Sequence, residues 1–448
     1  MKKKMIAYIS EFMLLFLVCF VLRIAVSFVP NARVETNVRK SYDNIVERGN
    51  YAALAIKAVD NEISKKDKLD YWTENGYLSS VLAVDPQHRV RSAMENVQEY
   101  DSAETEKGGA TRLISRLEGR NDAEMIRAEY WFGALTILRP LMYFFTYEQC
   151  ISIFQGMFWI LLGITMINMY KRLGGWAALA LVFSLANVNI VIIPMLFHTG
   201  LVFVITLLAV NFVIIKLKNS EDIVPIMIFV GVSTAYFDWL STPIVGFAVP
   251  TIVAILCLST NERHSNFMLV FKSGVAWAVS YLGMLLSKWM VASVILRRNI
   301  LTEALERIVA DSSNNIYTEN VGFKYVCEVI QRNIRFTEVF AFLPENTHLT
   351  VLGILMLLIV ALIVVFARRS KSRNILDALI WIFVTSLAPF VWFMAFKGHT
   401  YGHCWFTYRC LAGTTMGWVI IVMIIMKMLI GGKGIDDAGA IFPKVERQ

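Results

Sequence analysis

Leu69-Asp-Tyr-Trp-Thr-Glu-Asn-Gly-Tyr77 lies at the centre of a polar segment that extends from Asn31 to Arg139. Within this stretch two carboxylates, Asp70 and Glu74, are set among aromatic rings. One apolar run precedes the polar segment, and a series of long apolar runs with small polar clusters follows it. This order predicts a long loop outside the membrane, held between one membrane-spanning helix and a bundle of such helices.

The composition also favours a membrane protein. Of the 448 residues, 56% are hydrophobic and 17% are charged, whereas an ordinary soluble domain has about 25% charged residues. Much of the Lys and Arg excess, formally +8, lies at the ends of the apolar runs, where it orients a protein in the bilayer. The basic charge therefore does not indicate a nucleic-acid partner. The six cysteines show no CxxC and no Cys/His spacing typical of metal sites.

The positions of the basic residues predict an all-α polytopic protein with about ten transmembrane helices and both termini in the cytoplasm. Lys2, Lys3 and Lys4 precede the first span, so the chain after it emerges outside. That first run is too long for the apolar core of a signal peptide. The predicted divisions are an anchor at 1–30, an extracytoplasmic loop with amphipathic and interfacial helices at 31–147, transmembrane helices at 148–287, a second extracytoplasmic segment at 288–348, transmembrane helices at 349–430 and a cytoplasmic tail at 431–448.

Two local patterns refine the loop. Apolar residues at helical spacing over Tyr42–Asp60 predict an amphipathic helix at the membrane surface. The aromatic stretch Trp131–Tyr147 is interrupted by Arg139-Pro140, which predicts an interfacial or broken helix leading into the bilayer.

With this topology the unusual polar residues gather on the outer side. Asp70 and Glu74 are four residues apart and share one face of a helix. Two such carboxylates repel each other, and this repulsion can raise the pKa of one of them enough for it to act as a base. The alternative is an ordinary solvated face of a surface helix.

Two further clusters lie between predicted spans. His198 belongs to the hairpin Phe197-His-Thr-Gly200, where it is either a binding residue or a simple turn residue. Asp238 lies in Tyr236-Phe-Asp-Trp-Leu-Ser-Thr-Pro243, a carboxylate among aromatic rings at the outer boundary. Asp238 is a catalytic candidate, and capping the next helix or pairing with an arginine are its alternatives.

The richest short stretch is Lys397-Gly-His-Thr-Tyr-Gly-His-Cys-Trp-Phe-Thr-Tyr-Arg409. Its cationic donors suit a phosphate or pyrophosphate group, which Arg409 can bind through two parallel hydrogen bonds. Tyr408 and Arg409 could instead be interfacial anchors. His399 and His403 have the spacing of metal ligands on a helix, but the sequence offers no obvious third ligand. We therefore predict no metal site and no cofactor, and a divalent metal remains an alternative.

These motifs resemble a known family. A first span, a long outer loop with acidic residues and a helical membrane domain with outer polar loops resemble the GT-C superfamily of integral-membrane glycosyltransferases, which use lipid-phosphate-linked sugars. More closely, Asp70-Tyr-Trp-Thr-Glu74, the run from Arg127 through Tyr130-Trp131 and Gly133 to Leu138-Arg-Pro140, Phe237-Asp-Trp-Leu-Ser-Thr-Pro243 and His403…Phe406-Thr-Tyr-Arg409 resemble polytopic membrane proteins of Gram-positive bacteria.

The resemblance implies transfer of a sugar, with inversion, from a polyprenyl-phosphate-linked donor to a cell-envelope glycan or lipid acceptor outside the plasma membrane. By resemblance the base is Asp70 or Glu74, and Arg139 and Arg409 hold the lipid phosphate. The chain lacks the close acidic pair that the family has just after the first span, so the base is not fixed. The residue patterns add Asp238 to the catalytic candidates and add substrate-binding candidates at Arg127, His198, His399, His403 and Tyr408.

Three other functions remain open at this point. A transporter or flippase of envelope precursors would need polar residues at the middle of the membrane and broken helices in corresponding halves. The sequence shows no internal repeat, and its polar residues lie at the outer end. The other two alternatives are a different lipid-linked envelope transferase and a non-catalytic membrane component of an envelope complex.

Overall fold

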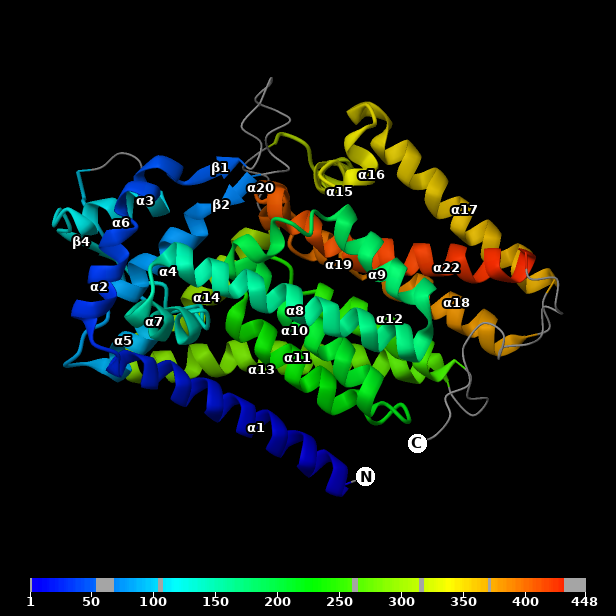
Figure 1. Cartoon of the computed structure of the whole chain (residues 1–448), viewed down its shortest axis with the longest axis horizontal. Helices are drawn as coiled ribbons and strands as arrows, with labels where there is room; N and C mark the ends of the chain where they lie inside the picture. Colours follow the sequence, from blue (N-terminus) through cyan, green and yellow to red (C-terminus); the bar gives the residue numbers. More distant parts are fainter. Residues whose placement is uncertain are drawn as a thin grey trace.

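The computed structural model describes residues 2–53, 68–103, 108–259, 265–313, 318–369 and 372–430. In these ranges the chain is helical apart from two short antiparallel ribbons, which confirms the all-α class. Figure 1 shows a bundle of long helices with a smaller polar domain, formed by the segment after α1, packed at one end. We call this part, Asn31–Phe144, the loop domain.

The loop domain has its own apolar core, formed by residues such as Val34, Tyr77, Leu113 and Leu138. Its ribbons pair Tyr51 with Asp70 and Gln98 with Met125. Its elements are α2 (Asn31–Lys40), α3 (Tyr42–Arg48), β1 (Tyr51–Ala53), β2 (Lys68–Asp70), α4 (Tyr71–Leu82), α5 (Arg89–Glu95), β3 (Gln98–Tyr100), α6 (Gly109–Leu117), β4 (Ala123–Met125) and α7 (Leu135–Phe144).

The prediction of one long amphipathic helix over Tyr42–Asp60 is wrong. Helix α3 ends at Arg48, because Gly49 takes a positive φ of 56° that a continuing helix does not allow. The chain then enters β1, and the remainder of the expected helix, 54–60, lies outside the described residues. The interruption expected at Arg139-Pro140 also lies elsewhere: α7 runs from Leu135 to Phe144 with Pro140 inside it, and the chain leaves the helix only after Phe144, before a separate long helix begins at Tyr147.

Several helices of the bundle are long and apolar enough to cross a membrane. Seven segments among the described residues are long and apolar enough to span a bilayer, by length and composition: Lys2–Phe28, Tyr147–Leu173, Phe197–Lys216, Asn266–Leu296, Glu345–Arg369, Arg373–Ala395 and Cys404–Lys427. Their helices are α1 (Lys2–Ala25) with η1 (Val26–Phe28), α8 (Tyr147–Leu173), α10 (Phe197–Lys216), α13 (Asn266–Leu296), η4 (Glu345–Thr347) with α17 (His348–Arg369), α18 (Arg373–Ser386) with α19 (Ala388–Ala395), and α21 (Cys404–Thr407), η5 (Tyr408–Leu411) and α22 (Ala412–Ile430).

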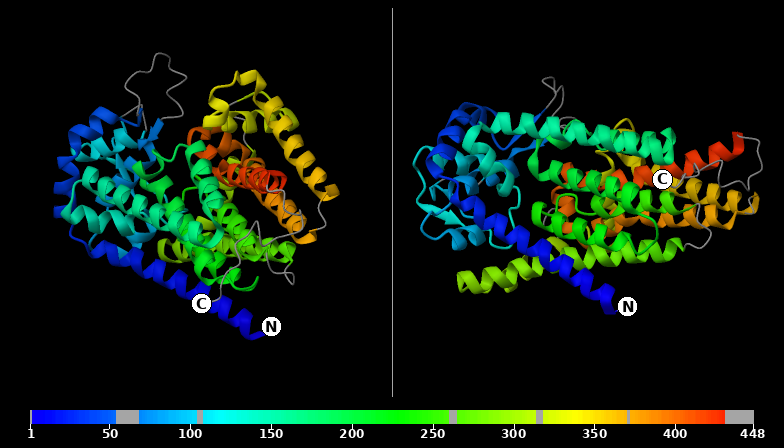
Figure 2. Two further views of the ribbon diagram at one scale, coloured as in Figure 1. Left: turned by 45° about the vertical axis from the view of Figure 1, so that its right-hand side comes forward. Right: turned by 60° about the horizontal axis from the view of Figure 1, so that its bottom comes forward.

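The expected count of about ten spans is not confirmed. Three of the expected spans are α9 (Gly175–Asn187), α11 (Ile223–Phe237) and α12 (Val245–Leu258), with 13, 15 and 14 residues. Helices of this length reach roughly 20–23 Å at 1.5 Å per residue, less than the ~30 Å of a typical hydrocarbon core. Helices α11 and α12 are mostly buried inside the bundle, whereas α9 exposes Leu179 and Phe183 on one face. Figure 2 shows α1 along one edge and α17 on the opposite side.

The second polar segment begins later than expected. Helix α13 continues to Leu296, where Arg297 takes a left-handed conformation and ends it, so positions 288–296 belong to the helix. The remaining elements are η3 (Ile193–Met195), α14 (Ile300–Ser313), α15 (Gly322–Ile334), α16 (Glu338–Ala341) and α20 (Lys397–Gly402).

Buried hydrogen bonds fix the loop domain to the bundle. Arg23 of α1 donates to the side-chain oxygen of Asn96 at 2.7 Å, and Lys288 of α13 donates to the Met94 carbonyl at 2.8 Å. The Trp131 indole donates to the carbonyl of Met284 at 2.9 Å. Because these groups come from both parts, α4 and the chain leading into α7 are held against the ends of the bundle helices, where the candidate site lies.

Candidate functional site

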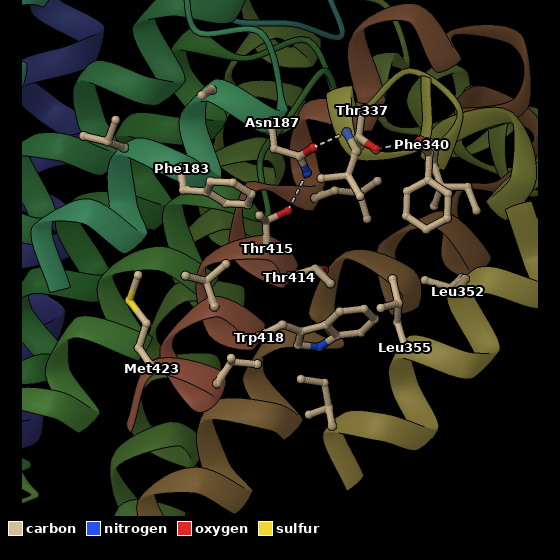
Figure 3. Close-up of a pocket in the computed structure, with 18 of the residues that line it drawn as sticks. Phe183, Asn187, Thr337, Phe340, Leu352, Leu355, Thr414, Thr415, Trp418 and Met423 are labelled. Atoms are coloured by element: carbon tan, nitrogen blue, oxygen red, sulfur yellow. Dashed lines mark hydrogen bonds between the residues drawn. The ribbon is translucent and has the colours of Figure 1, made fainter. Parts of the chain in front are cut away.

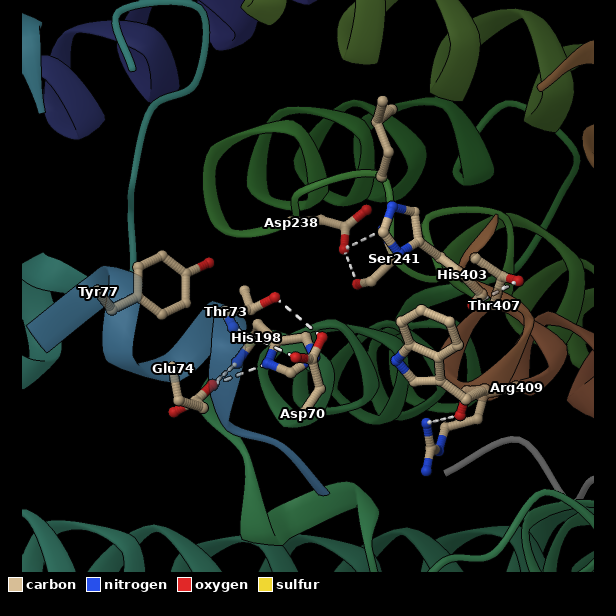
Figure 4. Close-up of polar contacts among 12 residues, drawn as sticks. Asp70, Thr73, Glu74, Tyr77, His198, Asp238, Ser241, His403, Thr407 and Arg409 are labelled. Atoms are coloured by element: carbon tan, nitrogen blue, oxygen red, sulfur yellow. Dashed lines mark hydrogen bonds and ion pairs between the residues drawn. The ribbon is translucent and has the colours of Figure 1, made fainter. Parts of the chain in front are cut away.

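A cavity of about 320 Å³ lies where the loop domain meets the ends of the bundle helices. Its walls come from segments far apart in the sequence, and Figure 4 shows several of these side chains converging. The lining combines carboxylate, imidazole, guanidinium, hydroxyl and aromatic groups: Asp70, Trp72, Thr73, Arg127, Tyr130, His198, Trp239, Ser241, Arg307, His399, His403, Trp405 and Phe406.

Asp70 lines this cavity and also caps helix α4. The Thr73 amide donates to one carboxylate oxygen of Asp70 at 3.2 Å, and the Thr73 hydroxyl donates to the other at 2.9 Å. The Asp70 side chain is buried. Asp70 is the residue before the helix. It therefore does not share a helical face with Glu74, contrary to the prediction from the sequence.

Glu74 points away from the cavity and holds His198. The carboxylate of Glu74 is fully buried and accepts hydrogen bonds from the Tyr147 hydroxyl at 2.7 Å and from the His198 backbone amide at 2.9 Å. One of its oxygens lies 2.8 Å from Nδ1 of His198. Burial alone raises the pKa of Glu74, but the hydrogen bonds from His198 and Tyr147 bring it below its ordinary value. Glu74 is therefore ionised and anchors the imidazole.

His198 presents its free nitrogen to the cavity. An ionised carboxylate only accepts, so we assign the proton to Nδ1 of His198, where it bonds Glu74. When the ring is neutral its lone pair is on Nε2, which lies 3.8 Å from Asp70 Oδ2. Nε2 is buried and has no hydrogen-bond partner among the described residues. This geometry leaves an oriented basic nitrogen at the cavity wall.

Two arginines supply the positive charge at the cavity. Arg127 lies 3.5 Å from Glu129, and Arg307 of α14 lies 3.4 Å from Asp311. Arg307 was not among the site residues predicted from the sequence. Its spacing of i, i+4 to Asp311 on an amphipathic helix is typical of an ion pair on a solvated surface. Such partly exposed pairs are worth little, about 0–1 kcal/mol, so an incoming anion can displace either carboxylate.

His399 and His403 line the cavity as neutral rings and not as cations. Burial lowers the pKa of His399 to about 4 and, together with the neighbouring His399, lowers the pKa of His403 to about 3. His399 bonds the Leu240 carbonyl through Nε2 at 3.0 Å. Over the described ranges no three His, Cys, Asp or Glu side chains are grouped so that they could hold a metal ion.

Asp238 lies beside the cavity, in a small neighbouring pocket of about 50 Å³. The backbone amide of Ser241 donates to one oxygen of Asp238 at 3.0 Å, and the Ser241 hydroxyl donates to the same oxygen. Burial raises the pKa of Asp238 to about 6. The two pockets are adjacent, since Tyr130 and Arg307 line both.

Besides Glu74 and Asp238, three more predicted site residues are absent from the cavity lining: Arg139, Tyr408 and Arg409. Tyr408 packs against Phe336, and Arg409 lies over the Tyr408 ring and donates to the Trp405 carbonyl at 3.3 Å. Arg139 donates to the carbonyls of Val26 at 2.9 Å and Val29 at 2.6 Å, as well as to the Val81 carbonyl and the side chain of Asn31. Its guanidinium joins the end of α1 to the loop domain.

We expect Arg139→Ala to destabilise the protein by at least about 3 kcal/mol, because each buried acceptor left without a donor costs about 1–3 kcal/mol. Thermal unfolding in detergent measures this loss. Arg91→Ala, at an exposed arginine of the same domain, is the matched control and should change stability by no more than about 0.5 kcal/mol. An Arg139→Ala protein with wild-type stability but reduced activity would return Arg139 to the candidate site.

The cavity brings together a base oriented by a carboxylate, two guanidinium groups and a wall of aromatic rings. No protein-family model, curated protein or solved structure matches this chain. The functional argument therefore rests on the chemistry of these side chains.

Proposed function

We propose that the protein is a membrane glycosyltransferase that moves a sugar from a polyprenyl-phosphate-linked donor to a cell-envelope acceptor at the outer face of the plasma membrane. The observation that carries the proposal is the cavity in which His198, Arg127 and Arg307 face one space bordered by aromatic rings. Its volume, about 320 Å³, falls in the ~300–1,000 Å³ range of small-molecule sites.

The aromatic rings suit a sugar. Trp72, Tyr130, Trp239 and Trp405 all line the cavity, and the rings of Tyr130 and Trp239 stack with centroids 5.4 Å apart. A pyranose ring presents apolar C–H faces that pack on such rings, while its hydroxyl groups bond polar side chains. Thr73 and Ser241 supply hydroxyl groups in the same lining.

The arginines suit the phosphate. In this reaction the bond between the anomeric carbon and the phosphate oxygen breaks, and negative charge builds up on the departing lipid phosphate. Guanidinium groups bind phosphate oxygens through short charge-assisted hydrogen bonds. Arg127 and Arg307, freed from Glu129 and Asp311, would stabilise that charge as it develops.

His198 suits the role of base. The acceptor hydroxyl attacks the anomeric carbon from the face opposite the phosphate, so one C–O bond forms as the other breaks and the configuration inverts. The hydroxyl proton passes to Nε2 of His198, and the ionised Glu74 stabilises the resulting imidazolium. Glu74 then acts as a positioning residue, and Asp70, 3.8 Å from Nε2, can bond the acceptor.

The direct test incubates the purified protein in nanodiscs with synthetic polyprenyl-phosphate monosaccharides and measures the release of free polyprenyl phosphate. We expect release from one donor of the panel in the presence of envelope extract as the acceptor source, and no consumption of a nucleotide-linked sugar offered in its place. Consumption of a nucleotide sugar, or of none of the lipid-linked donors, would contradict the proposal.

The proposed orientation places both termini in the cytoplasm and the loop domain outside. In a cysteine-free background, a membrane-impermeant maleimide should label Ser102→Cys in intact cells, because Ser102 is exposed on the loop domain. Lys171→Cys, at the opposite end of α8, should be labelled only after permeabilisation. The reverse pattern would invert the topology and put the cavity on the cytoplasmic side.

A further inference from the structure

A second cavity, of about 750 Å³, lies between α9, α17 and α22 at the side of the bundle. Figure 3 shows its walls, with Phe183 from α9, Trp418 and Met423 from α22, and Leu352 and Leu355 from α17. We call it the lateral groove. Its lining is almost wholly hydrocarbon and aromatic.

The few polar side chains of the lateral groove already have partners. Asn187 donates to the Thr415 hydroxyl at 2.8 Å and accepts from the Val339 amide at 2.9 Å. The Thr414 hydroxyl donates to the Ser386 carbonyl at 2.7 Å. The groove therefore has little to offer a polar ligand and suits a hydrocarbon chain, since burying an unpaired polar group is costly.

The lateral groove lies along membrane-spanning helices. Both α17 and α22 belong to segments able to span the bilayer, and the lining residues of the last segment run from Leu411, at the end of η5, to Met423 of α22. That distance is roughly 18 Å along a helix, more than half of a ~30 Å hydrocarbon core. Leu179, which lines the groove, is 60% exposed, so the groove is open to the surface that the spans present to lipid.

The lateral groove is separate from the candidate site. The two cavities share no lining residue, whereas the small pocket beside Asp238 shares Tyr130 and Arg307 with the site. The groove is therefore not an extension of the site cavity. We propose that the lateral groove binds one acyl chain of a bilayer phospholipid as a resident lipid, distinct from any lipid-linked substrate.

The resident chain would support one wall of the candidate site. Ile334 and Thr337 line the groove, and the neighbouring Asn333 donates to the Thr400 carbonyl at 3.1 Å and accepts from the Thr407 hydroxyl at 2.7 Å. Thr400 and Thr407 flank the stretch that carries His403. Filling the groove with an acyl chain holds α15 in place, and α15 holds that stretch.

The first experiment needs no variant. The wild-type chain is placed in nanodiscs containing a phospholipid with a photoactivatable diazirine in one acyl chain, and the crosslinked peptides are mapped by mass spectrometry. We expect crosslinks to concentrate on the groove-lining parts of α9, α17 and α22. An equal yield on the exposed face of α13, around Val279, would show only general lipid contact and overturn the proposal.

The second experiment fills the groove. Val182→Trp adds bulk at the lining, and Val279→Trp adds the same bulk on an exposed face outside it. Native mass spectrometry after delipidation should show one phospholipid retained by the wild type and by Val279→Trp, and none by Val182→Trp. Retention by Val182→Trp, or displacement of the retained lipid by a polyprenyl phosphate, would overturn the proposal. Neither result depends on transferase activity, so this proposal and the proposed function fail separately.

Discussion

His198→Gln is expected to lower sugar transfer by about 10²–10⁴-fold, the usual contribution of a general base, without lowering stability to a similar degree. The Nε2 nitrogen of His198 is buried at the cavity wall without a hydrogen-bond partner among the described residues, and its ring is fixed through Nδ1 by Glu74. Glutamine keeps a polar side chain of similar length but cannot take the proton. The measurement is the rate of polyprenyl phosphate release in nanodiscs, with thermal unfolding measured alongside.

Variants around His198 separate its role from that of the two carboxylates. Glu74→Gln should lower kcat and leave KM nearly unchanged, because Glu74 lies behind the ring and does not line the cavity. His88→Gln changes an exposed histidine of the loop domain, away from the cavity lining, and should have no effect. If Asp70→Asn abolished transfer while His198→Gln remained active, Asp70 would be the base, and the proposed reaction would stand with a different proton acceptor.

The sequence predicted which end of the bundle carries the candidate site, but it did not predict which residue has which role there. Charged groups avoid the hydrocarbon, so Asp70, His198, Arg127 and His403 were expected together at one end of the helices, and they do line one cavity there. The pairing of Glu74 with His198 joins positions 124 residues apart. No local pattern encodes such a contact, and without it Glu74 was taken for a base.

Arg139 and Arg307 show a different limit. The family resemblance gave Arg139 the role of holding the lipid phosphate, yet its guanidinium bonds backbone carbonyls. Every residue has a backbone carbonyl, so the sequence does not show which arginine bonds to one. An arginine that anchors the fold and an arginine that binds a ligand therefore cannot be told apart from the sequence. Arg307 was missed for the opposite reason, because its spacing to Asp311 is that of an ordinary surface ion pair.

Burial also decides whether a histidine is charged, and the sequence does not show how deeply a side chain is buried. His399 and His403 were expected among the cations, but burial keeps both rings neutral at physiological pH. Arg127 and Arg307 therefore carry the positive charge at the cavity. Substituting these arginines is a better test of phosphate binding than substituting the histidines.

Arg307→Ala is expected to lower transfer by about 10²–10³-fold, the usual cost of losing one donor that stabilises developing charge. Arg307 lines both the site cavity and the adjoining pocket of Asp238, and its pair with Asp311 is partly exposed and easily exchanged for a phosphate. Its stability should change little, because a partly exposed ion pair contributes about 0–1 kcal/mol. The rate and the KM for the lipid-linked donor are measured together.

Arg307→Lys distinguishes phosphate binding from a general requirement for positive charge. Lysine keeps the charge but lacks the planar fork that bonds two phosphate oxygens at once, so it should recover only part of the lost rate. Arg298→Ala, at an exposed arginine just before α14 that pairs with Glu303, is the matched control and should behave as the wild type. Full activity of Arg307→Ala would remove this residue from the site. Equal losses in the Arg307 and Arg298 variants would show that the net charge of the segment matters and not a bond to the departing phosphate.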